Sequence, residues 1–466
     1  MTDSNGNSEI DIPEKKYSTW THISFNLIMV MLPATYGMYA THVFWYYETE
    51  VLLPVLFVGL AIVIFSIWDA FNDPLIGYLS DRPNKLTKKY GRRFPYIVIF
   101  GIPTMVTLIL LFTPPQTDAQ SNPWPVFIWL LVILLLHEVS YTAVSLARAL
   151  FPEKFRSDAE RRKNAGINIF TYNIGLFMGL IIPMLIVREG DLQSYWIAAI
   201  TLMIPCFILY LLGIHGVKED KQMRERALKA EHDPFFPMIK KALKRKNFVV
   251  LALVSISTQV FAACIMGSIY YYVKFILLLP VDSQADVILM LTWFLTGLLS
   301  VPFWMKLANK TGNKNLQMIG VLAVICACIP VFIVRSLMGA IISFAILGFT
   351  IGSLTFIKFP IFGDLIDEVT LIDEKRQEGL YQGVFVFLDR IGIILTPIIF
   401  TITHIVTDFN PQSETQTLVA QQGILMAMLG IPALIMLISA LIFWKYFDLT
   451  PEKTLLIKGK LKEKNL

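Results

Sequence analysis

The sequence predicts an all-α membrane protein with twelve transmembrane helices in two six-helix halves. Hydrophobic residues make up 55% of the chain and charged residues only 16%, whereas soluble domains carry about 25% charged residues. Apolar runs long enough to cross a bilayer as helices recur along the whole length, which favours helices over a barrel. The runs cover residues 20–46, 51–78, 94–113, 125–150, 164–187, 194–216, 247–277, 285–308, 315–335, 339–366, 379–406 and 420–447.

The distribution of basic residues predicts the orientation of these helices. Most of the 40 Lys and Arg residues lie in the N-terminal segment, the tail and alternate loops, whereas the intervening loops contain only Arg188 and Arg335. By the positive-inside rule, both termini are expected in the cytoplasm of a protein integral to the cell (plasma) membrane. The net charge of +5 therefore reflects topology, and no nucleic-acid partner is expected. The first nineteen residues lack the pattern of a cleaved signal peptide.

Two loops with related sequences suggest that the halves are internal repeats. Asp81-Arg82 and Gly91-Arg92-Arg93 form a glycine-bounded basic turn after the second span, and residues 307–314 after the eighth span are a degraded copy of it. We therefore expect an N-terminal half over residues 1–216, a cytoplasmic linker over 217–246 and a C-terminal half with a cytoplasmic tail over 247–466. For the charged linker we favour a solvated tether over a surface helix.

The second span carries the strongest functional signal, the stretch Trp68-Asp69-Ala70-Phe71-Asn72-Asp73-Pro74. A carboxylate within the bilayer costs roughly 2.5–3.5 kcal/mol on insertion scales, and this span carries two. The helical spacing puts Asp69, Asn72 and Asp73 on one face. Carboxylate and amide oxygens suit a small hard cation such as Na+, or a proton. The alternative is that the pair only holds neighbouring helices together.

Further charges inside the spans are candidates for a central cavity. We expect Arg390 to face Asp69 and Asp73 as an internal counter-charge that competes with the bound ion; local pairing of Arg390 is the alternative. Lys358 is expected to contact an anionic substrate or to pair with Glu138, or else to extend to the cytoplasmic edge. Glu138 itself is interpreted as a pairing partner or a proton site.

These residues, with the Asp81-Arg82 and Gly91-Arg92-Arg93 elements, resemble the glycoside-pentoside-hexuronide:cation symporters of the major facilitator superfamily, the melibiose permease-like family. Ala149-Leu150-Phe151-Pro152 and the stretch Gly363-Asp364-Leu365-Ile366-Asp367-Glu368 extend the resemblance over essentially the whole chain. The resemblance implies the major facilitator fold and a site for Na+, Li+ or H+. In this sequence that site falls on Asp69, Asn72, Asp73 and Thr142, and the lysine of the family's eleventh helix falls on Arg390.

The resemblance is incomplete at the positions that bind sugar in that family. The family's acid in the first helix has no counterpart, its fourth-helix tryptophan falls on Arg148, and its fifth-helix arginine falls near Asn168. Galactoside specificity is therefore not implied, and Arg148 with Lys358 would suit a negatively charged solute such as a hexuronide. The stretch from Asp364 to Arg390 also resembles the lysophosphatidylcholine symporters of the same superfamily.

We therefore predict a secondary transporter that couples symport of a small solute, a sugar or sugar acid, to Na+ or H+. A lysolipid-type substrate is the alternative, and a non-transporting receptor or scaffold a remote one. No enzyme motif is present, so neither catalytic residues nor a cofactor is expected, and no metal beyond the coupling cation. We expect a monomer whose partners are the solute, the cation and membrane lipids. The predicted site residues are Asp69, Asn72, Asp73 and Thr142 for the cation; Glu138, Arg148, Asn168, Lys358 and Arg390 for the substrate cavity; and Asp81, Arg82, Arg92, Arg93, Asp364 and Asp367 for gating.

Overall fold

The computed structural model describes residues 16–81, 87–155, 158–221, 223–224, 235–280, 283–374 and 378–463. Twelve helices within these ranges are long and apolar enough to cross a membrane, as the apolar runs predict. The first span is formed by α1 with η1, α2 and η2. The helices of the first six spans and the loop between them are α1 (Thr19–Leu27), η1 (Ile28–Val30), α2 (Met31–Trp45), η2 (Tyr46–Glu50), α3 (Val55–Asp81), α4 (Thr87–Tyr90), α5 (Phe94–Leu111), α6 (Trp124–Lys154), α7 (Asp158–Ile186) and α8 (Leu192–Gly213).

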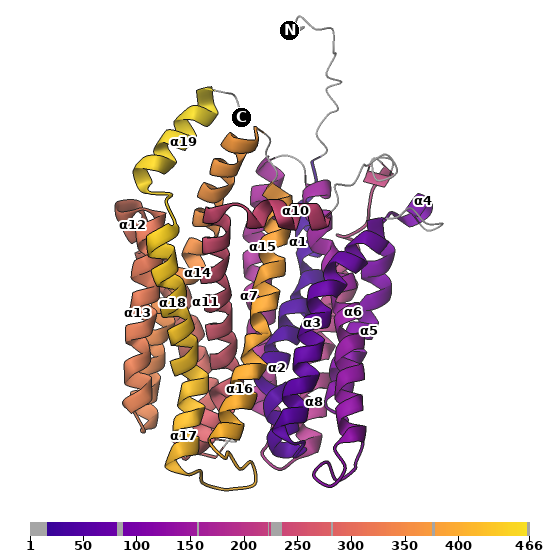
Figure 1. Ribbon diagram of the computed structural model, residues 1–466. Coiled ribbons are helices and arrows are strands. Elements are labelled where there is room, and N and C mark those ends of the chain that lie inside the picture. Colours follow the sequence, from indigo (N-terminus) through magenta and orange to yellow (C-terminus); the bar gives the residue numbers. More distant parts are fainter. Residues whose placement is uncertain are drawn as a thin grey trace, which may run out of the picture.

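The second six spans follow a short helix that runs across the end of the bundle (Figure 1). The eleventh span is divided between α15 and α16, and the twelfth between α17, η5 and α18. The helices after residue 234 are α10 (Phe235–Leu243), α11 (Lys246–Tyr271), η3 (Tyr272–Ile276), α12 (Ala285–Thr311), α13 (Asn313–Ile333), α14 (Leu337–Asp373), α15 (Glu378–Ile393), α16 (Leu395–Val406), α17 (Leu418–Leu425), η5 (Met426–Gly430), α18 (Ile431–Tyr446) and α19 (Pro451–Glu463).

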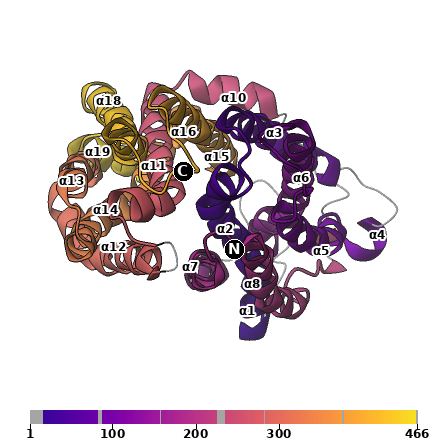
Figure 2. The same ribbon diagram turned by 90° about the horizontal axis from the view of Figure 1, so that it is seen from below.

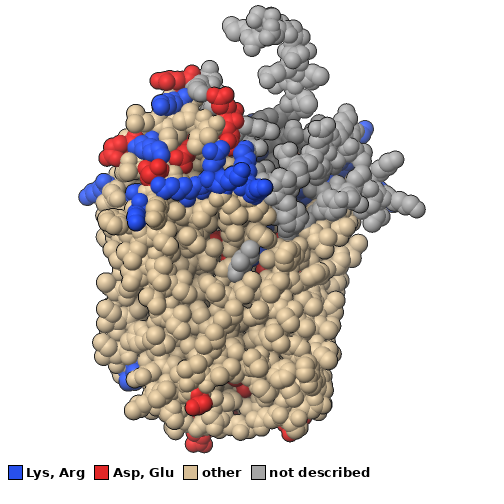
Figure 3. All heavy atoms as spheres, in the orientation of Figure 1, with Lys and Arg blue, Asp and Glu red and all other residues tan. Residues whose placement is uncertain are grey.

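The spans gather in two groups that follow chain order. Figure 2 shows α2, α3, α5, α6, α7 and α8 on one side and α11 to α18 on the other. On the face drawn in Figure 3, Lys and Arg side chains lie mainly at the end of the bundle where the described chain begins and ends, above an almost uncharged belt. We call the opposite end the far end. The domain boundaries at residues 216 and 247 stay a prediction.

The first span of each group ends in the same unusual way. Five-residue π-helical turns, Tyr46–Glu50 and Tyr272–Ile276, complete the two helices. A leucine with positive φ follows each turn, Leu52 at 60° and Leu278 at 55°. Such a backbone is uncommon for leucine, because its Cβ crowds the carbonyl oxygen. The same positive-φ leucine at equivalent places in both groups supports an internal repeat, independently of the similarity between the two loops.

Small residues allow α2 and α7 to approach closely within the first group. The Cβ of an alanine at Gly179 would lie 2.1 Å from the carbonyl oxygen of Ala34, and one at Gly37 would lie 2.9 Å from the backbone of Gly179. Backbones that approach this closely are a common way for membrane helices to associate. An alanine Cβ at Gly166, on the same α7 helix, would have no neighbouring atom within 4 Å among the described residues.

The predicted tether between the halves lies partly outside the described residues. Within the described part, α10 lies across the bundle end in Figure 1. Lys241 of α10 forms an ion pair with Asp373 at the end of α14, at 2.8 Å, and Arg245 contacts the same carboxylate. The last part of the linker is therefore a helix fixed to the second group. Most of residues 221–231, for which a solvated tether was favoured over a surface helix, lie outside the described residues.

We predict that Gly179→Val destabilises the protein, because its side chain overlaps the α2 backbone. Overpacking of this kind costs about 1–3 kcal/mol. Thermal unfolding in detergent should show a lower midpoint for this variant than for Gly166→Val, the matched control on the same helix. Equal midpoints for the two variants would contradict the close helix contact.

Candidate functional site

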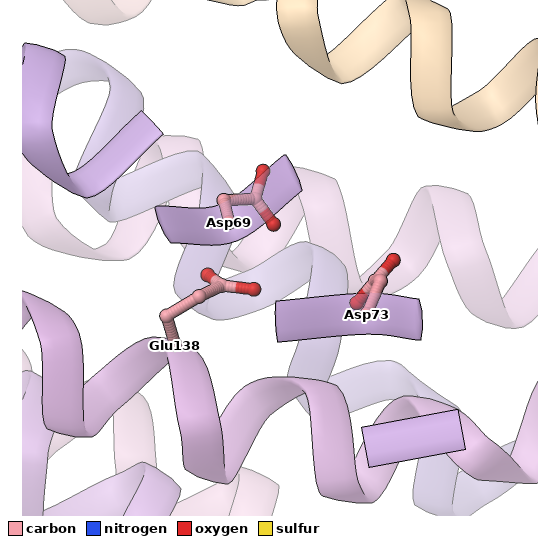
Figure 4. Close-up of side chains that lie close together, drawn as sticks. All are labelled: Asp69, Asp73 and Glu138. Carbon is pink, nitrogen blue, oxygen red and sulfur yellow. The ribbon is translucent and has the colours of Figure 1, made fainter. Parts of the chain in front are cut away.

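Three carboxylates meet between α3 and α6 at the centre of the bundle. Asp69 and Asp73 lie one turn apart on α3, and Glu138 approaches from α6 (Figure 4). One oxygen from each lies within 4.8 Å of the others. The Glu138 side chain is 6% exposed and that of Asp73 30%, so the cluster runs from the packed interior to an accessible edge. Three like charges at this spacing repel strongly unless a cation or protons accompany them.

Arg390 of α15 supplies that positive charge from the other half of the molecule. Its guanidinium contacts Asp69 directly, lies 3.1 Å from Asp73 Oδ2 and lies 3.5 Å from Glu138 Oε1. One guanidinium thus contacts all three acids, which its planar, many-donor shape allows. The expected position of Arg390 opposite Asp69 and Asp73 agrees with this geometry. The role proposed for the contact, competition with a bound ion, stays a prediction.

Thr142 and Asn72 complete the polar surface around the acids. The Thr142 hydroxyl lies 2.9 Å from both Asp73 Oδ1 and Glu138 Oε1. Asn72 donates from Nδ2 to the backbone carbonyl of Glu138 at 3.3 Å, and its buried Oδ1 has no hydrogen-bond partner among the described residues. All four residues predicted for the cation therefore lie together, and Glu138, predicted for the substrate cavity, belongs to the same cluster.

α3 and α16 also pack closely across the two halves, about three turns along α3 from Asp69. A Cβ at Gly59 of α3 would lie 1.9 Å from the Thr401 hydroxyl of α16, so a larger residue would require that side chain to move. In the same span, α15 carries Arg390 and precedes α16.

The other residues predicted for the cavity are spread more widely. Arg148 is exposed on α6, where its charge acts on Asp73. Asn168 of α7 donates to Asn26 Oδ1 at 3.0 Å and links two helices of the first group. Lys358 forms an ion pair with Asp389 at 2.9 Å. The expected pairing of Lys358 with Glu138 is therefore wrong: Asp389 lies close to the ammonium group, while Glu138 faces Arg390.

The basic turn after the second span fixes helix ends, as its sequence suggests. Arg92 and Arg93 both contact Glu153 Oε1 at the end of α6, at 2.8 and 2.6 Å. Glu219, at the start of the linker, accepts hydrogen bonds from the backbone amides of Arg92, Arg93 and Phe94, at 3.0, 2.7 and 3.0 Å. Arg82 and the side chain of Asp81 lie outside the described residues.

The equivalent place in the second group binds the C-terminal helix. Asp364 of α14 accepts from Asn313 Nδ2 and pairs with Lys458 of α19 at 3.0 Å. Lys453 of α19 pairs with Glu368 at 3.1 Å. Asp367 is half-buried on the same helix as Asp364. The tail, for which no role was predicted, is thus fixed to the helix that carries residues predicted for gating.

At the far end, the two halves are joined by buried polar contacts that the sequence analysis did not identify. Glu48 lies 2.8 Å from His404 Nδ1 and accepts from the Tyr271 hydroxyl, and all three side chains are buried. His42 Nε2 lies 2.6 Å from the Tyr270 hydroxyl. Glu48 was overlooked because it follows the first apolar run, but the aromatic stretch Phe44–Tyr47 before it indicated a continued buried helix. These contacts close the far end of the interface between the halves.

The chain matches a known family and several related proteins. The family described as MFS/sugar transport protein matches residues 22–450. The sodium-dependent lysophosphatidylcholine symporter 1 of Mus musculus is 20% identical over 86% of this chain and 78% of that protein. The glucuronide carrier protein homolog of Escherichia coli (strain K12) is 23% identical over 85% of each chain. A match to an uncharacterized symporter of Synechocystis sp., at 25% identity, covers 49% of this chain and 41% of that protein.

Solved structures agree with the fold. The crystal structure of a D-xylose-proton symporter has a TM-score of 0.65 at 14% identity, covering 91% of this chain and 98% of that one. At this identity the likeness extends to the fold alone. The homologues and structural neighbours are transporters, which agrees with the expectation that the chain is not an enzyme.

We predict that Arg390→Gln destabilises the protein at neutral pH, because three close carboxylates lose their shared cation. Removing one partner of a buried ion pair costs about 3–5 kcal/mol, and we expect the lower end because Asp73 is partly exposed. Replacing Glu138 as well removes one of the like charges, so the thermal midpoint of Arg390→Gln/Glu138→Gln should lie above that of Arg390→Gln. Arg335→Gln, at an exposed arginine, is the control. A double variant with no higher midpoint would show that the acids are not what Arg390 stabilises.

Proposed function

The chain belongs to the MFS/sugar transport protein family, and we propose that it is a symporter that couples movement of a small sugar or sugar acid to Na+ or H+. The observation that carries the proposal is the cluster of Asp69, Asp73 and Glu138 shared with Arg390. Two acids come from one helix and the guanidinium from the opposite half. The group that balances the charge of the acids therefore affects how strongly the two halves are held together.

The hydrogen bonds of Thr142 favour a positively charged ligand at this site. A hydroxyl has one proton, so Thr142 donates to only one of the two carboxylates that lie 2.9 Å away. A proton on Asp73 or Glu138 would satisfy the second contact, and a Na+ ion between the oxygens would remove their repulsion. The unpartnered Oδ1 of Asn72 offers one more neutral oxygen. This donor set suits a hard cation.

We propose that Arg390 and the coupling cation alternate at the acids. With Arg390 engaged and the far end closed by Glu48, His404 and Tyr271, one positive charge offsets part of the negative charge of the three acids without an ion. A cation that binds the acids would weaken their attraction for Arg390 and release the inter-half contact. Differential affinity of the two arrangements for cation and solute then couples the two fluxes.

We place both termini in the cytoplasm of a plasma-membrane protein, since Lys and Arg concentrate at the end that carries the termini. The far end then faces the outside. Both walls of the interface come from one chain, so a monomer suffices for the proposed cycle.

A lysolipid-type substrate is the second candidate. The similarity to the mouse lysophosphatidylcholine symporter over 86% of the chain favours it. Arg148, exposed on α6 and without an ion pair among the described residues, offers a cation for a phosphate group. Uptake assays with lysophosphatidylcholine and with sugars in the same proteoliposomes separate the two candidates.

We predict that Asp73→Asn abolishes gradient-driven accumulation while exchange across the membrane persists. Asparagine keeps the shape of the side chain but removes the charge that holds the cation. In proteoliposomes under an imposed Na+ or H+ gradient, accumulation should fall at least tenfold. Asp118→Asn, in an exposed far-end loop, should behave as wild type. Normal uphill uptake by Asp73→Asn would overturn the cation-site assignment.

A further inference from the structure

A buried carboxylate at the far end takes no part in the proposed symport. Asp286 lies in the first turn of α12, its side chain is fully buried, and neither of its oxygens has a hydrogen-bond partner among the described residues. The Tyr270 hydroxyl of α11 lies close enough to interact with it electrostatically. Buried polar groups are nearly always paired in folded proteins, so a carboxylate without a partner requires an explanation.

Tyr270 connects this carboxylate to the other half of the chain. Its hydroxyl lies 2.6 Å from Nε2 of His42 on α2, and the His42 side chain is also fully buried. We call Asp286, Tyr270 and His42 the far-end triad. One titratable residue from each half thus lies on either side of a single tyrosine. Separation of the halves at the far end would break the triad between Tyr270 and His42.

The hydrogen bonds of His42 fix the state of one ring nitrogen. Thr41 Oγ1 donates its single proton to the backbone carbonyl of Gly37, at 2.9 Å. His42 Nδ1 lies 2.5 Å from the same hydroxyl oxygen, so Nδ1 has to carry a proton and donate it there. A change in the protonation of the ring therefore takes place at Nε2, which faces Tyr270.

Each proton arrangement that satisfies the triad holds one proton more than ionised Asp286 with neutral His42. If Nε2 carries no proton, it accepts from Tyr270, and Asp286 needs its own proton to donate to the tyrosine oxygen. If Nε2 carries a proton, it donates to that oxygen, and Tyr270 donates to ionised Asp286. Both arrangements have no net charge, and they differ only in where the proton lies.

The surroundings offer no other charge to balance Asp286. The groups that act on it are the backbone amides of its own turn and the Tyr270 hydroxyl, and no charged group among the described residues acts on His42. The start of a helix favours a carboxylate, but by less than an unpaired buried charge costs. The nearby titratable groups have other contacts: Glu50, which also acts on Tyr270, with Tyr195 and the amide of Gly190; Tyr195 with the face of His42; Glu48 with Tyr271 and His404; Lys274 with Glu189; Arg335 with two backbone carbonyls; and Arg188 is exposed.

We propose that the far-end triad is a proton-binding site that holds one proton while the far end is closed and releases it when the halves separate there. Opening would part Tyr270 from His42 and admit water to both. In water, aspartic acid and histidine have pKa values of about 4 and about 6.5, so neither keeps the proton at pH 7.5. The proposal goes beyond the proposed symport and shares with it only the separation of the halves.

The proposed site links opening to the pH at the far end with a definite sign. Above about pH 6.5, opening releases one proton, so each unit of rising pH favours the open far end by up to about tenfold. Below that pH a separated His42 keeps the proton, so the triad adds nothing and the central acids alone determine the response. The proton leaves and returns on the same side, so the site controls opening without moving protons across the membrane.

Thermal unfolding at pH 7 and pH 9 tests the bound proton. The unfolded chain releases this proton above about pH 6.5, so the wild-type midpoint should fall as the pH rises. Asp286→Asn can donate to Tyr270 without a bound proton, so its midpoint should fall less. Asp118→Asn, at an exposed aspartate of a far-end loop, is the control and should keep the wild-type pH dependence. Equal pH dependence in Asp286→Asn and the wild type would overturn the bound proton. If Asp286→Asn does not fold, the neutral Asp286→Leu takes its place.

Distances between spin labels test the release of the proton on opening. The labels are placed at the exposed Gln120 and Glu414 of two far-end loops, with the exposed Cys326 replaced. An Asp73→Asn background removes the cation response of the central acids. Between pH 7 and pH 9 the ratio of open to closed populations should rise by up to about a hundredfold. Asp286→Asn in the same background should abolish the rise.

An unchanged ratio between pH 7 and pH 9, or a rise that persists in Asp286→Asn, would overturn the proposed release. Failure of this proposal is separable from failure of symport. Accumulation that requires Asp73, in a protein whose pH dependence ignores Asp286, rejects only the triad. A pH-dependent ratio that requires Asp286, in a protein without gradient-driven accumulation, rejects only the symport.

Discussion

The structure depends on how three carboxylates are neutralised inside a largely apolar bundle. Asp69, Asp73 and Glu138 lie within hydrogen-bonding reach of one guanidinium, and that guanidinium belongs to the other half of the chain. Desolvated charges of like sign are expensive to hold together, and the protein offsets that cost with an arginine, which retains its proton in any surroundings. A permanent cation on one half therefore faces a cluster of acids on the other.

In the proposed function, this arrangement connects ion binding to the position of the halves. A lysine or histidine in the same place could lose its charge, whereas arginine keeps it. A cation that binds the acids would therefore compete with Arg390 for them. The far-end contacts of Glu48, His404 and Tyr271 join the same two halves at the other end of the interface.

The sequence alone predicted the features that depend on local patterns of residues. The twelve spans follow from hydropathy, because a chain in lipid must satisfy its backbone hydrogen bonds within each helix. The shared face of Asp69, Asn72 and Asp73 follows from helical spacing. The position of Arg390 opposite them was predicted from the scarcity of charges inside the spans, and from the family resemblance.

Contacts between distant helices could not be predicted from local sequence patterns. Lys358 was expected to contact an anionic substrate, to pair with Glu138 or to extend to the cytoplasmic edge, but it pairs with Asp389 of α15, which sequence spacing could not identify. Glu48 lay past the end of the apolar run, so its burial depended on a π-helical turn that hydropathy does not reveal. The related stretches Tyr46–Pro54 and Tyr272–Pro280 held a usable signal of that turn, because both continue with leucines and end in proline.

The central claim is that a cation and Arg390 alternate at the acids and thereby move the halves. It is tested most directly by the distance between spin labels at the exposed Gln120 and Glu414 of two far-end loops, after replacement of the exposed Cys326. We expect a longer distance distribution when saturating Na+ is added or the pH is lowered, and no such shift in Asp73→Asn. Identical distributions in the wild type under all cation conditions would contradict it.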